Sequence, residues 1–454
     1  MQPTRKLSVL ARLPRPSRRV RGVFTALHLL SVLGLLLWGC ADDVAQGPCD
    51  TRFRACQERI AREVLAARGG PVADLPVIEV ITEAELRERF SEEMMALTPE
   101  EELSFAWWGR ALVLLRLVES PAALTAGTLE DFVTHVAGYY DRETRVITLI
   151  DRGVPRSLED ASNLFAHEFA HHVQNVDESA GFALHDGLDD TLDGVDALSH
   201  HGEGEAVVIS GLVTVALRGD TPEAQDWEQY FAGWLVGARA EVADSADPYV
   251  VVRSRMKYPV GGAYLMDAWL AGGADGLREQ WTPGVRETAS WMRGYGERAS
   301  AEPIDHCEIP RAPLGYAAWT DERLGGELLF PMLVPPEERG EVYLAASWAS
   351  AMGWRGDHLR VFVGPTEDAP IALAYRVRTA SLDAARDIAA RLTAAQDEQV
   401  IVMHLDTDVL LLASEAAGAW DALSFPLDCA GVPMGLSPAR MRSLADRLPP
   451  LTAW

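Results

Sequence analysis

The chain has 454 residues, of which 41 are Lys or Arg and 67 are Asp or Glu, so its formal net charge is −26 at pH 7. Such an acidic surface repels nucleic-acid phosphates, and we expect no nucleic-acid partner. The length and a hydrophobic content of 48% allow two domains with full cores.

The first 40 residues differ in composition from the rest of the chain. They contain seven Lys or Arg and no acidic residue, and an apolar run over residues 23–38 follows the basic part. This order is typical of a secretory signal peptide. The run ends at Gly39-Cys40, which resembles the bacterial lipobox, so we expect Cys40 to become the lipidated first residue of the mature protein. An uncleaved anchor is the alternative, but the run is short for a bilayer helix and contains His28.

Both interpretations place the folded part outside the cytoplasm, at the bacterial cell envelope. Beyond Cys40 four cysteines remain: Cys49, Cys56, Cys307 and Cys429. An even number in an exported protein predicts two disulfides. We favour pairing Cys49 with Cys56 and Cys307 with Cys429, because this closes a local turn and a separate C-terminal domain.

Hydrophobic periodicity and capping residues predict the elements of the first part. We expect helices over residues 52–68, 99–118 and 128–136 and strands over 77–81 and 146–150. Thr82-Glu83-Ala84-Glu85 forms a capping box that opens a further helix. Residues 145–150 precede the next helix and are a candidate for binding an extended peptide by strand addition; a structural hairpin is the alternative.

That next helix, predicted over residues 161–174, contains His167-Glu168-Phe169-Ala170-His171. Because an α-helix turns 100° per residue, the two histidines lie on one face and can bind one metal ion. Glu168 lies one step round the same side, where it can act as general base on a metal-bound water. His172 points about 100° away from His171, so we do not expect it to be a ligand. The pattern predicts a hydrolytic zinc site.

The third ligand must come from elsewhere in the chain. Glu203-Gly204-Glu205-Ala206 begins an apolar run that predicts a second buried helix. The segment resembles the E-G-x-A segment of gluzincin metallopeptidases, whose leading Glu binds zinc, and this implies Glu203 as the ligand. Glu205 lies about 200° round the helix from Glu203, so the two cannot both face the metal. Asp177 stays an alternative because HExxHxxQxxD imitates the metzincin pattern, although Gln174 stands where that family has a Gly.

The segment between the two halves of the site, residues 182–199, is rich in Asp and Gly and predicts a loop. Its acidic residues lack the order of a calcium-binding EF-hand, so we expect a solvated loop. These residues are Asp186, Asp189, Asp190, Asp193 and Asp196. Further helices are expected over residues 220–246 and 258–271.

After Pro303 the pattern predicts a small α+β domain with a structural or substrate-recruiting role. We expect residues 321–325 to lead a helix-like run, strands over 359–363 and 371–377, a helix over 381–392, and a hairpin of 400–405 with 409–412. The predicted fold class is α+β. A signal peptide over residues 1–40 precedes a mainly helical, zincin-like metallopeptidase domain with a small edge sheet over 41–305, and the C-terminal α+β domain covers 306–454.

The resemblance extends beyond the zinc motif. The order GYYDxET, HExxHxxQ, EGEA and YPVGG resembles uncharacterised bacterial lipoproteins of the gluzincin peptidase type, over roughly residues 77–414. It implies one Zn²⁺ per chain, held by His167, His171 and Glu203. The motif helix departs from those relatives, since it reads HEFAHHVQNV where they usually read HELTHALQDQ, and residues 287–292 lack a His that often falls there.

These observations predict a lipid-anchored zinc metallopeptidase that hydrolyses peptide or protein substrates, with Glu168 as the catalytic base. A donor to the developing oxyanion is also needed. Tyr258 and His201 are candidates, together with His200 and Tyr140. The alternatives are a non-catalytic, zinc-stabilised envelope lipoprotein that binds a partner, and an envelope scaffold in which the motif is incidental.

Overall fold

The computed structural model describes residues 47–71, 73–95, 97–185, 191–282, 286–295, 301–396 and 400–421. The predicted signal peptide with Cys40, and Cys429, lie outside these residues, as do Asp186, Asp189 and Asp190. From Pro48 onward, the described residues belong to one compact unit.

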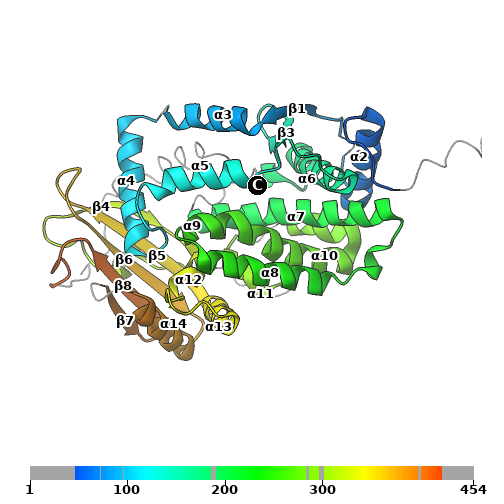
Figure 1. Ribbon diagram of the computed structural model, residues 1–454. Helices are drawn as coiled ribbons and strands as arrows, with labels where there is room; N and C mark the ends of the chain where they lie inside the picture. Colours follow the sequence, from blue (N-terminus) through cyan, green and yellow to red (C-terminus); the bar gives the residue numbers. More distant parts are fainter. Residues whose placement is uncertain are drawn as a thin grey trace, which may run out of the picture. The chain divides into compact units, whose positions relative to one another are not determined.

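The first part of this unit is a three-stranded sheet with the helices around it (Figure 1). In chain order the elements are α2 Arg54–Arg68, β1 Val77–Thr82, α3 Glu83–Met95, α4 Pro99–Leu114, α5 Ala123–His135, β2 Gly138–Asp141 and β3 Val146–Asp151. The predicted capping box is confirmed: the Thr82 backbone N–H donates to the Glu85 carboxylate at 2.7 Å, and the Glu85 N–H donates to Thr82 Oγ1 at 3.2 Å.

The order of the strands corrects one prediction. The sheet runs β1-β3-β2, with β1 parallel and β2 antiparallel to β3. Both edges of β3 are therefore paired, so strand addition to residues 145–150 is wrong. The short edge strand β2, with the sequence Gly138-Tyr139-Tyr140-Asp141, was not among the predicted strands.

Four long helices form the body that carries the metal motif (Figure 1). They are α6 Leu158–Val176, α7 Leu192–Arg218, α8 Trp227–Asp244 and α10 Lys257–Gln280. The predicted loop is wrong from residue 192 onward, because the Thr191 side chain caps α7 by accepting from the Gly194 N–H at 3.2 Å. Short helical segments, α9 Pro248–Val251 and a π-helical turn Val252–Met256, lead into α10, and α11 Thr288–Arg293 follows it.

Two glycines let α7 and α10 approach each other closely. A Cβ added to Gly204 on α7 would lie 2.4 Å from the carbonyl carbon of Gly261, and a Cβ on Gly261 of α10 would lie 2.2 Å from the carbonyl oxygen of His200. The small residues of the EGEA and YPVGG segments thus have a packing reason. Any side chain at these positions would push the two helices apart.

The remaining elements build a five-stranded antiparallel sheet with three helices, and the fold as a whole is α+β as predicted. In chain order they are β4 Ala317–Glu322, α12 Gly325–Met332, α13 Glu341–Ala351, β5 Trp354–Val363, β6 Ile371–Thr379, α14 Leu382–Ala395, β7 Ile401–Leu405 and β8 Asp408–Ser414. The strand order is β4-β5-β6-β8-β7. The predicted helix-like run is present as α12, which begins at Gly325, whereas residues 321 and 322 still belong to β4.

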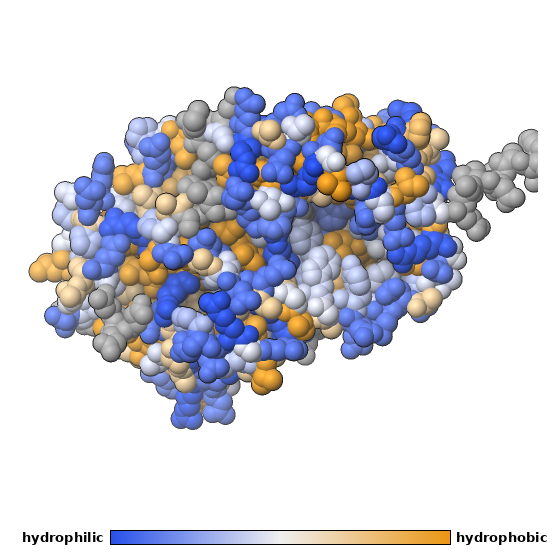
Figure 2. Space-filling view, in the orientation of Figure 1, coloured by the Kyte–Doolittle hydropathy of each residue, from blue (hydrophilic) through white to orange (hydrophobic). Residues whose placement is uncertain are grey.

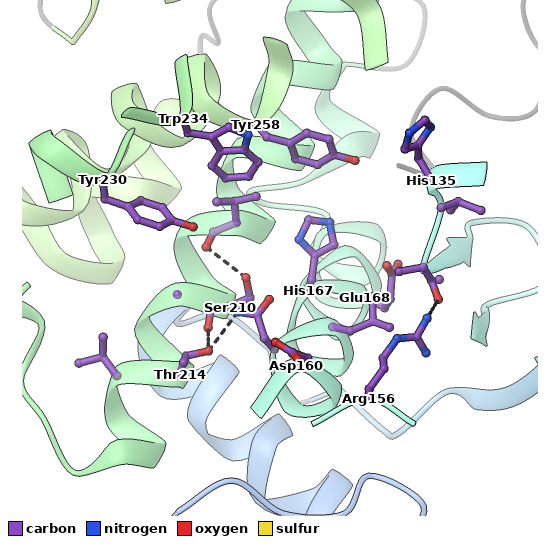
Figure 3. A pocket seen from close by; sticks show the side chains of 18 of the residues that line it. His135, Arg156, Asp160, His167, Glu168, Ser210, Thr214, Tyr230, Trp234 and Tyr258 are labelled. Carbon is purple, nitrogen blue, oxygen red and sulfur yellow. Dashed lines mark hydrogen bonds between the residues drawn. The ribbon is translucent and has the colours of Figure 1, made fainter. Parts of the chain in front are cut away.

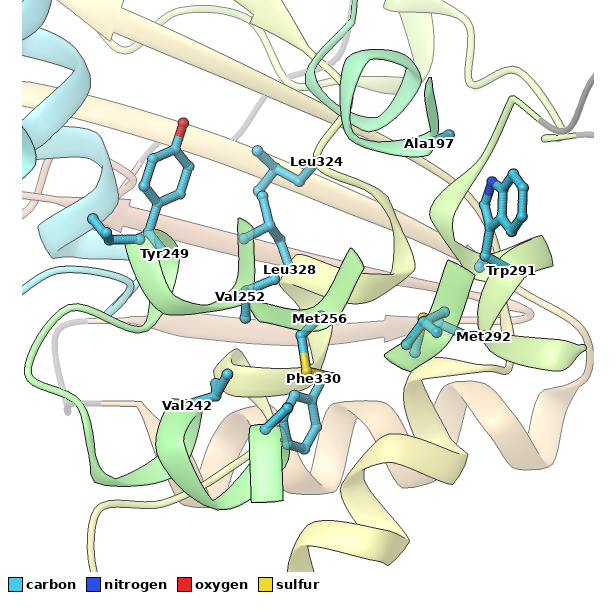
Figure 4. Close-up of a cluster of buried hydrophobic side chains, with 14 of the residues drawn as sticks. Ala197, Val242, Tyr249, Val252, Met256, Trp291, Met292, Leu324, Leu328 and Phe330 are labelled. Atoms are coloured by element: carbon cyan, nitrogen blue, oxygen red, sulfur yellow. The ribbon is translucent and has the colours of Figure 1, made fainter. Parts of the chain in front are cut away.

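The hydrophobic core is continuous between the helices and this sheet. Figure 4 shows Met256, which precedes α10, against Phe330 of α12, with the sheet behind them, and both side chains are buried in one cluster with Trp354 of β5. Two buried carboxylates tie the same elements together: Asp193 accepts from the Thr288 N–H at 2.9 Å, and Asp357 accepts from the Gly325 N–H at 2.8 Å. A domain boundary between residues 305 and 306 stays a prediction.

Cysteine pairing follows the expectation where it can be seen. Cys49 and Cys56 form a disulfide just before α2. Cys307 is also a disulfide cysteine. Within the described part of the chain, no helix combines the length and the apolar character needed to cross a bilayer.

The close approach of α7 and α10 generates a prediction about stability. Gly261→Ala should lower the free energy of unfolding by about 1–3 kcal/mol, because its methyl group overlaps the backbone of α7. Gly237→Ala on α8 is the matched control, since a Cβ there has no neighbour within 4 Å, and it should be neutral or stabilising by up to about 1 kcal/mol. Urea unfolding followed by circular dichroism measures both. Equal values for the two variants would contradict the packing role.

Candidate metal centre

Helix α6 holds its two metal-motif histidines on a buried face. The Ser157 side chain caps the helix by accepting from the Asp160 N–H at 3.0 Å. Phe165 and Phe169 are fully buried and fix the rotation of the helix against the core. His167 and His171 are consequently directed at α7, where Glu203 lies.

The three side chains present their ligand atoms to one point. Glu203 Oε2 lies 3.1 Å from His167 Nε2 and 3.3 Å from His171 Nε2, and the two imidazole nitrogens are 3.2 Å apart. Ligand atoms bound tetrahedrally to zinc at about 2.0–2.1 Å are separated by roughly 3.3 Å. The triangle of one oxygen and two nitrogens therefore has the size and the chemistry of three zinc ligands.

Glu168 lies beside this triangle and is not part of it. Its side chain is 2% exposed, and burial raises the pKa of its carboxyl group to about 8. Glu203 behaves in the opposite way: burial alone would raise its pKa, but the charges of Lys257 and then His171 hold that pKa well below its usual range. The pKa values of these two neighbouring carboxyl groups are thus shifted in opposite directions, which is typical of a metal ligand next to an acid–base group.

Gln174 fixes the orientation of the His171 ring. Its side-chain Nε2 donates to the carbonyl of Gly202 and to Glu205 Oε2, both at 2.8 Å. Its Oε1 is therefore the atom that faces His171 Nδ1, at 2.8 Å. That nitrogen must carry the proton and donate it, which leaves the lone pair of Nε2 free for a metal.

The two rival ligands belong to an outer network. Glu205 pairs with Arg68 at 3.1 Å, and Arg68 also pairs with Asp177 at 3.0 Å. Asp177 additionally accepts from Arg278. The structure therefore brings Glu203 to the imidazoles and places Asp177 and Glu205 behind them. Arg68 is fully buried on α2, and no local pattern in its helix could have revealed this role.

Lys257 is a further participant that the sequence analysis missed. Its Nζ lies 3.2 Å from Glu203 Oε1, and both side chains are 1% exposed. The π-helical turn Val252–Met256 immediately precedes it, a feature often found where a helix must direct residues at a site. Burial lowers the pKa of Lys257 to about 8. Its place directly before YPVGG was the available signal.

The structure separates the candidate oxyanion donors. The ring of Tyr258 lies 6.2 Å from that of His167, and burial raises the pKa of its hydroxyl well above its usual value. His201 stacks on Trp281 at 3.8 Å, and His200 bonds to Glu327 at 2.9 Å. Tyr140 OH lies 3.1 Å from His172 Nδ1, which places both residues in a packed pair.

A cavity of about 540 Å³ opens beside Glu168 and His167. Its walls come from the loop before β2 and from helices α6, α7 and α8, and Tyr258 closes one side. Figure 2 shows the surface hollowed between the elements around α6 and those around α8. In Figure 3, Tyr230, Trp234 and Tyr258 line one wall, and His167 and Glu168 lie across from them.

A second group of ligand-type side chains lies at Asp305, His306 and Cys307. Because the sulfur of Cys307 is committed to a disulfide, it cannot supply a thiolate. We therefore assign no metal site there.

Comparisons of the chain with protein-family models, with curated proteins and with solved structures found no match. The geometry of the site is therefore the basis for assigning a function.

The outer network predicts a pH dependence of stability. Burial alone would raise the pKa of Asp177, but hydrogen bonds from Ser179, Arg278 and Arg68 lower it to about 2. Because the folded pKa lies below the unfolded value of about 3.9, the carboxylate stabilises the fold above pH 4, and this contribution is lost as the pH falls toward 2.

Wild-type protein should therefore be more stable than Asp177→Asn by about 1–2 kcal/mol at pH 6. The difference should shrink as the pH is lowered from 4.5 to 2.5. Urea unfolding of both proteins across this range measures it, and a difference that does not change with pH would contradict the assigned ion pairs.

Proposed function

We propose that the protein is a zinc-dependent metallopeptidase of the gluzincin type, with a zincin-like fold around its site. The observation that carries the proposal is the triangle of His167, His171 and Glu203 with Glu168 at its side, next to a cavity. Export and an N-terminal lipid on Cys40 are part of the proposal, and the disulfide of Cys49 with Cys56 suits an oxidising compartment.

The number of ligands supports catalysis over a purely structural metal site. Structural zinc sites are closed by four protein ligands, whereas catalytic sites use three and keep one position open. Among the described residues, three side chains meet at this point. The Glu168 carboxylate and a cavity adjoin these three side chains, and no fourth ligand joins them within the part of the chain that the structure describes.

The residues divide the chemistry between them. Bound by His167, His171 and Glu203, zinc would act as a Lewis acid that polarises the peptide carbonyl, lowers the pKa of water and favours the carboxylate form of Glu168. Glu168 then takes a proton from the attacking water and delivers it to the leaving amine. The Tyr258 hydroxyl donates to the carbonyl oxygen as negative charge develops there.

The edge of β2 offers a way to hold the substrate backbone. The Ile150 N–H donates to the carbonyl of Ala137 at 3.0 Å. Because hydrogen-bonding directions alternate along an antiparallel strand, the backbone groups of Gly138 face away from β3. Gly138 lines the cavity, so an extended peptide can add to this edge beside Glu168.

Glu168→Gln tests the proposed reaction. The change keeps the size of a side chain that is already buried, so fold and zinc content should be preserved. Removal of the proton acceptor should lower kcat/KM for casein-derived fluorogenic peptides by at least about 100-fold. Peptide cleavage that persists in this variant would show that Glu168 is not the base.

The metal assignment has a control in the adjacent histidine. Wild-type protein should contain about one zinc per chain by mass spectrometry, His167→Ala should lose it, and His172→Gln should keep it because His172 bonds to Tyr140 and to the Asp74 carbonyl. If neither variant lost zinc, the HExxH motif would be incidental.

Lys257→Met tests the contact on the ligand Glu203. In metal-free protein the change leaves a buried carboxylate without its cation, and the free energy of unfolding should fall by about 3 kcal/mol. Zinc replaces the missing charge, so the rise in melting temperature on zinc addition should be larger in Lys257→Met than in wild type. Thermal unfolding with EDTA and with zinc measures this rise.

Lys257→Arg, which keeps the charge, is the matched control and should respond to zinc more like wild type. If Lys257→Met loses the same stability with and without zinc, the lysine has only a packing role.

A further inference from the structure

Helix α8 lays a row of aromatic rings along the cavity. Trp227, Tyr230 and Trp234 recur at a spacing that places them on one face of the helix. Ring centroids are 6.0 Å apart between Trp227 and Tyr230 and 6.1 Å apart between Tyr230 and Trp234. The row continues from Trp234 to Tyr258 at 5.8 Å and from Tyr258 to the metal ligand His167 at 6.2 Å, as Figure 3 shows for its last four members.

Two of these rings are not fully buried in the hydrophobic core. Tyr230 is 47% exposed and Trp234 is half-buried, although both line the cavity. Trp227 anchors the row, because a Cβ on Gly211 of α7 would lie 3.2 Å from its ring. Aromatic surface kept open inside a concave site is typical of a place that binds an apolar group.

The floor of this part of the cavity is also weakly polar. It is formed by α7, where the Ser210 hydroxyl donates to the Val207 carbonyl at 3.2 Å and the Thr214 hydroxyl donates to the Ser210 carbonyl at 2.8 Å. Both hydroxyl groups thus use their protons within their own helix. They offer little to a charged ligand.

The cations near the rings are neutralised by partners of their own. Arg218 pairs with Glu159, and Arg255 pairs with Asp131 at 2.9 Å. Arg156, at the other side of the cavity in Figure 3, differs in its partners. It bonds to the backbone carbonyls of Ala137 and Ile150, and within the described part of the chain no acidic side chain lies in ion-pair range of it.

We infer that the half of the cavity under α8 is the subsite for a large uncharged side chain of the substrate, preferably an aromatic one, next to the bond that is cut. The inference rests on the proposed peptidase function and names its substrate class. The volume of about 540 Å³ lies within the range of small-molecule sites and exceeds what one such side chain needs. Edge-to-face and stacked contacts with the row supply the selectivity.

The test uses blocked peptides that are identical except at one position on either side of the scissile bond. That position carries Phe, Leu, Ala, Lys or Asp. Zinc-loaded wild type should cleave the Phe peptide with a kcat/KM at least about 10-fold above that of the Ala peptide, with Lys and Asp lowest. Binding of the same peptides to Glu168→Gln, measured by calorimetry, should follow the same order without turnover.

Trp234→Ala should reduce the ratio of kcat/KM for the Phe peptide to that for the Ala peptide toward one. Tyr230→Ala, at a half-exposed position that tolerates truncation, should lower the ratio as well. Tyr295→Ala is the matched control, because Tyr295 is 41% exposed and lies outside the cavity lining, and it should keep the wild-type ratio.

The outcomes separate the two proposals. If wild type cleaves casein in a zinc- and Glu168-dependent way but prefers Asp, Lys or Ala peptides, the subsite inference is overturned and the peptidase assignment stands. A preference for Phe that survives both Trp234→Ala and Tyr230→Ala also overturns it. If no zinc-dependent cleavage occurs, both proposals fall together.

Discussion

The site depends on the buried carboxylate of Glu203, both oxygens of which have close polar partners. Glu203 is 1% exposed and directs one oxygen at two imidazoles and the other at the ammonium group of Lys257. Removing such a charge from water is costly unless cations or donors surround it. Helices α6, α7 and α10, which carry these side chains, must therefore keep fixed positions relative to one another. The close approach of Gly204 on α7 to Gly261 on α10 contributes to this.

Hydrogen bonds and ion pairs around His167, His171 and Glu203 hold the helices of the site in place. Gln174 hydrogen-bonds to both His171 and Glu205, and Arg68 pairs with both Glu205 and Asp177. These contacts connect α2, α6 and α7. A ligand ring that hydrogen-bonds to a fixed group keeps its tautomer and its angle. The same contacts explain why Asp177, at a spacing that suits a metal ligand, has a different role: two arginines already hold its carboxylate.

Sequence reasoning recovered what short-range periodicity determines. The shared face of His167 and His171 follows from the helical repeat. In the C-terminal sheet, β5, β6 and the hairpin of β7 with β8 were predicted from their β-branched and apolar residues, whereas β4 was not. It failed where a contact far along the chain decides. Residues 192–199 were predicted as a loop but are helical, and Asp193 there has its partners in Thr288 and Arg323, about 95 and 130 positions away. Lys257 stands directly before YPVGG, but its contact with Glu203, 54 positions away in the sequence, could not be read from that local pattern.

Helix α7 joins the two halves of the proposed function on one rigid element. Glu203 is followed by Val207, Ser210 and Thr214, at spacings that keep all four near one stripe of the helix. The first holds the proposed metal, and the others form the floor under the aromatic row of α8. Because a helix transmits its position over several turns without bending, a substrate side chain seated on that floor is fixed in relation to Glu203. Recognition and chemistry are therefore aligned by the backbone of α7, and loops are not needed to bring them together.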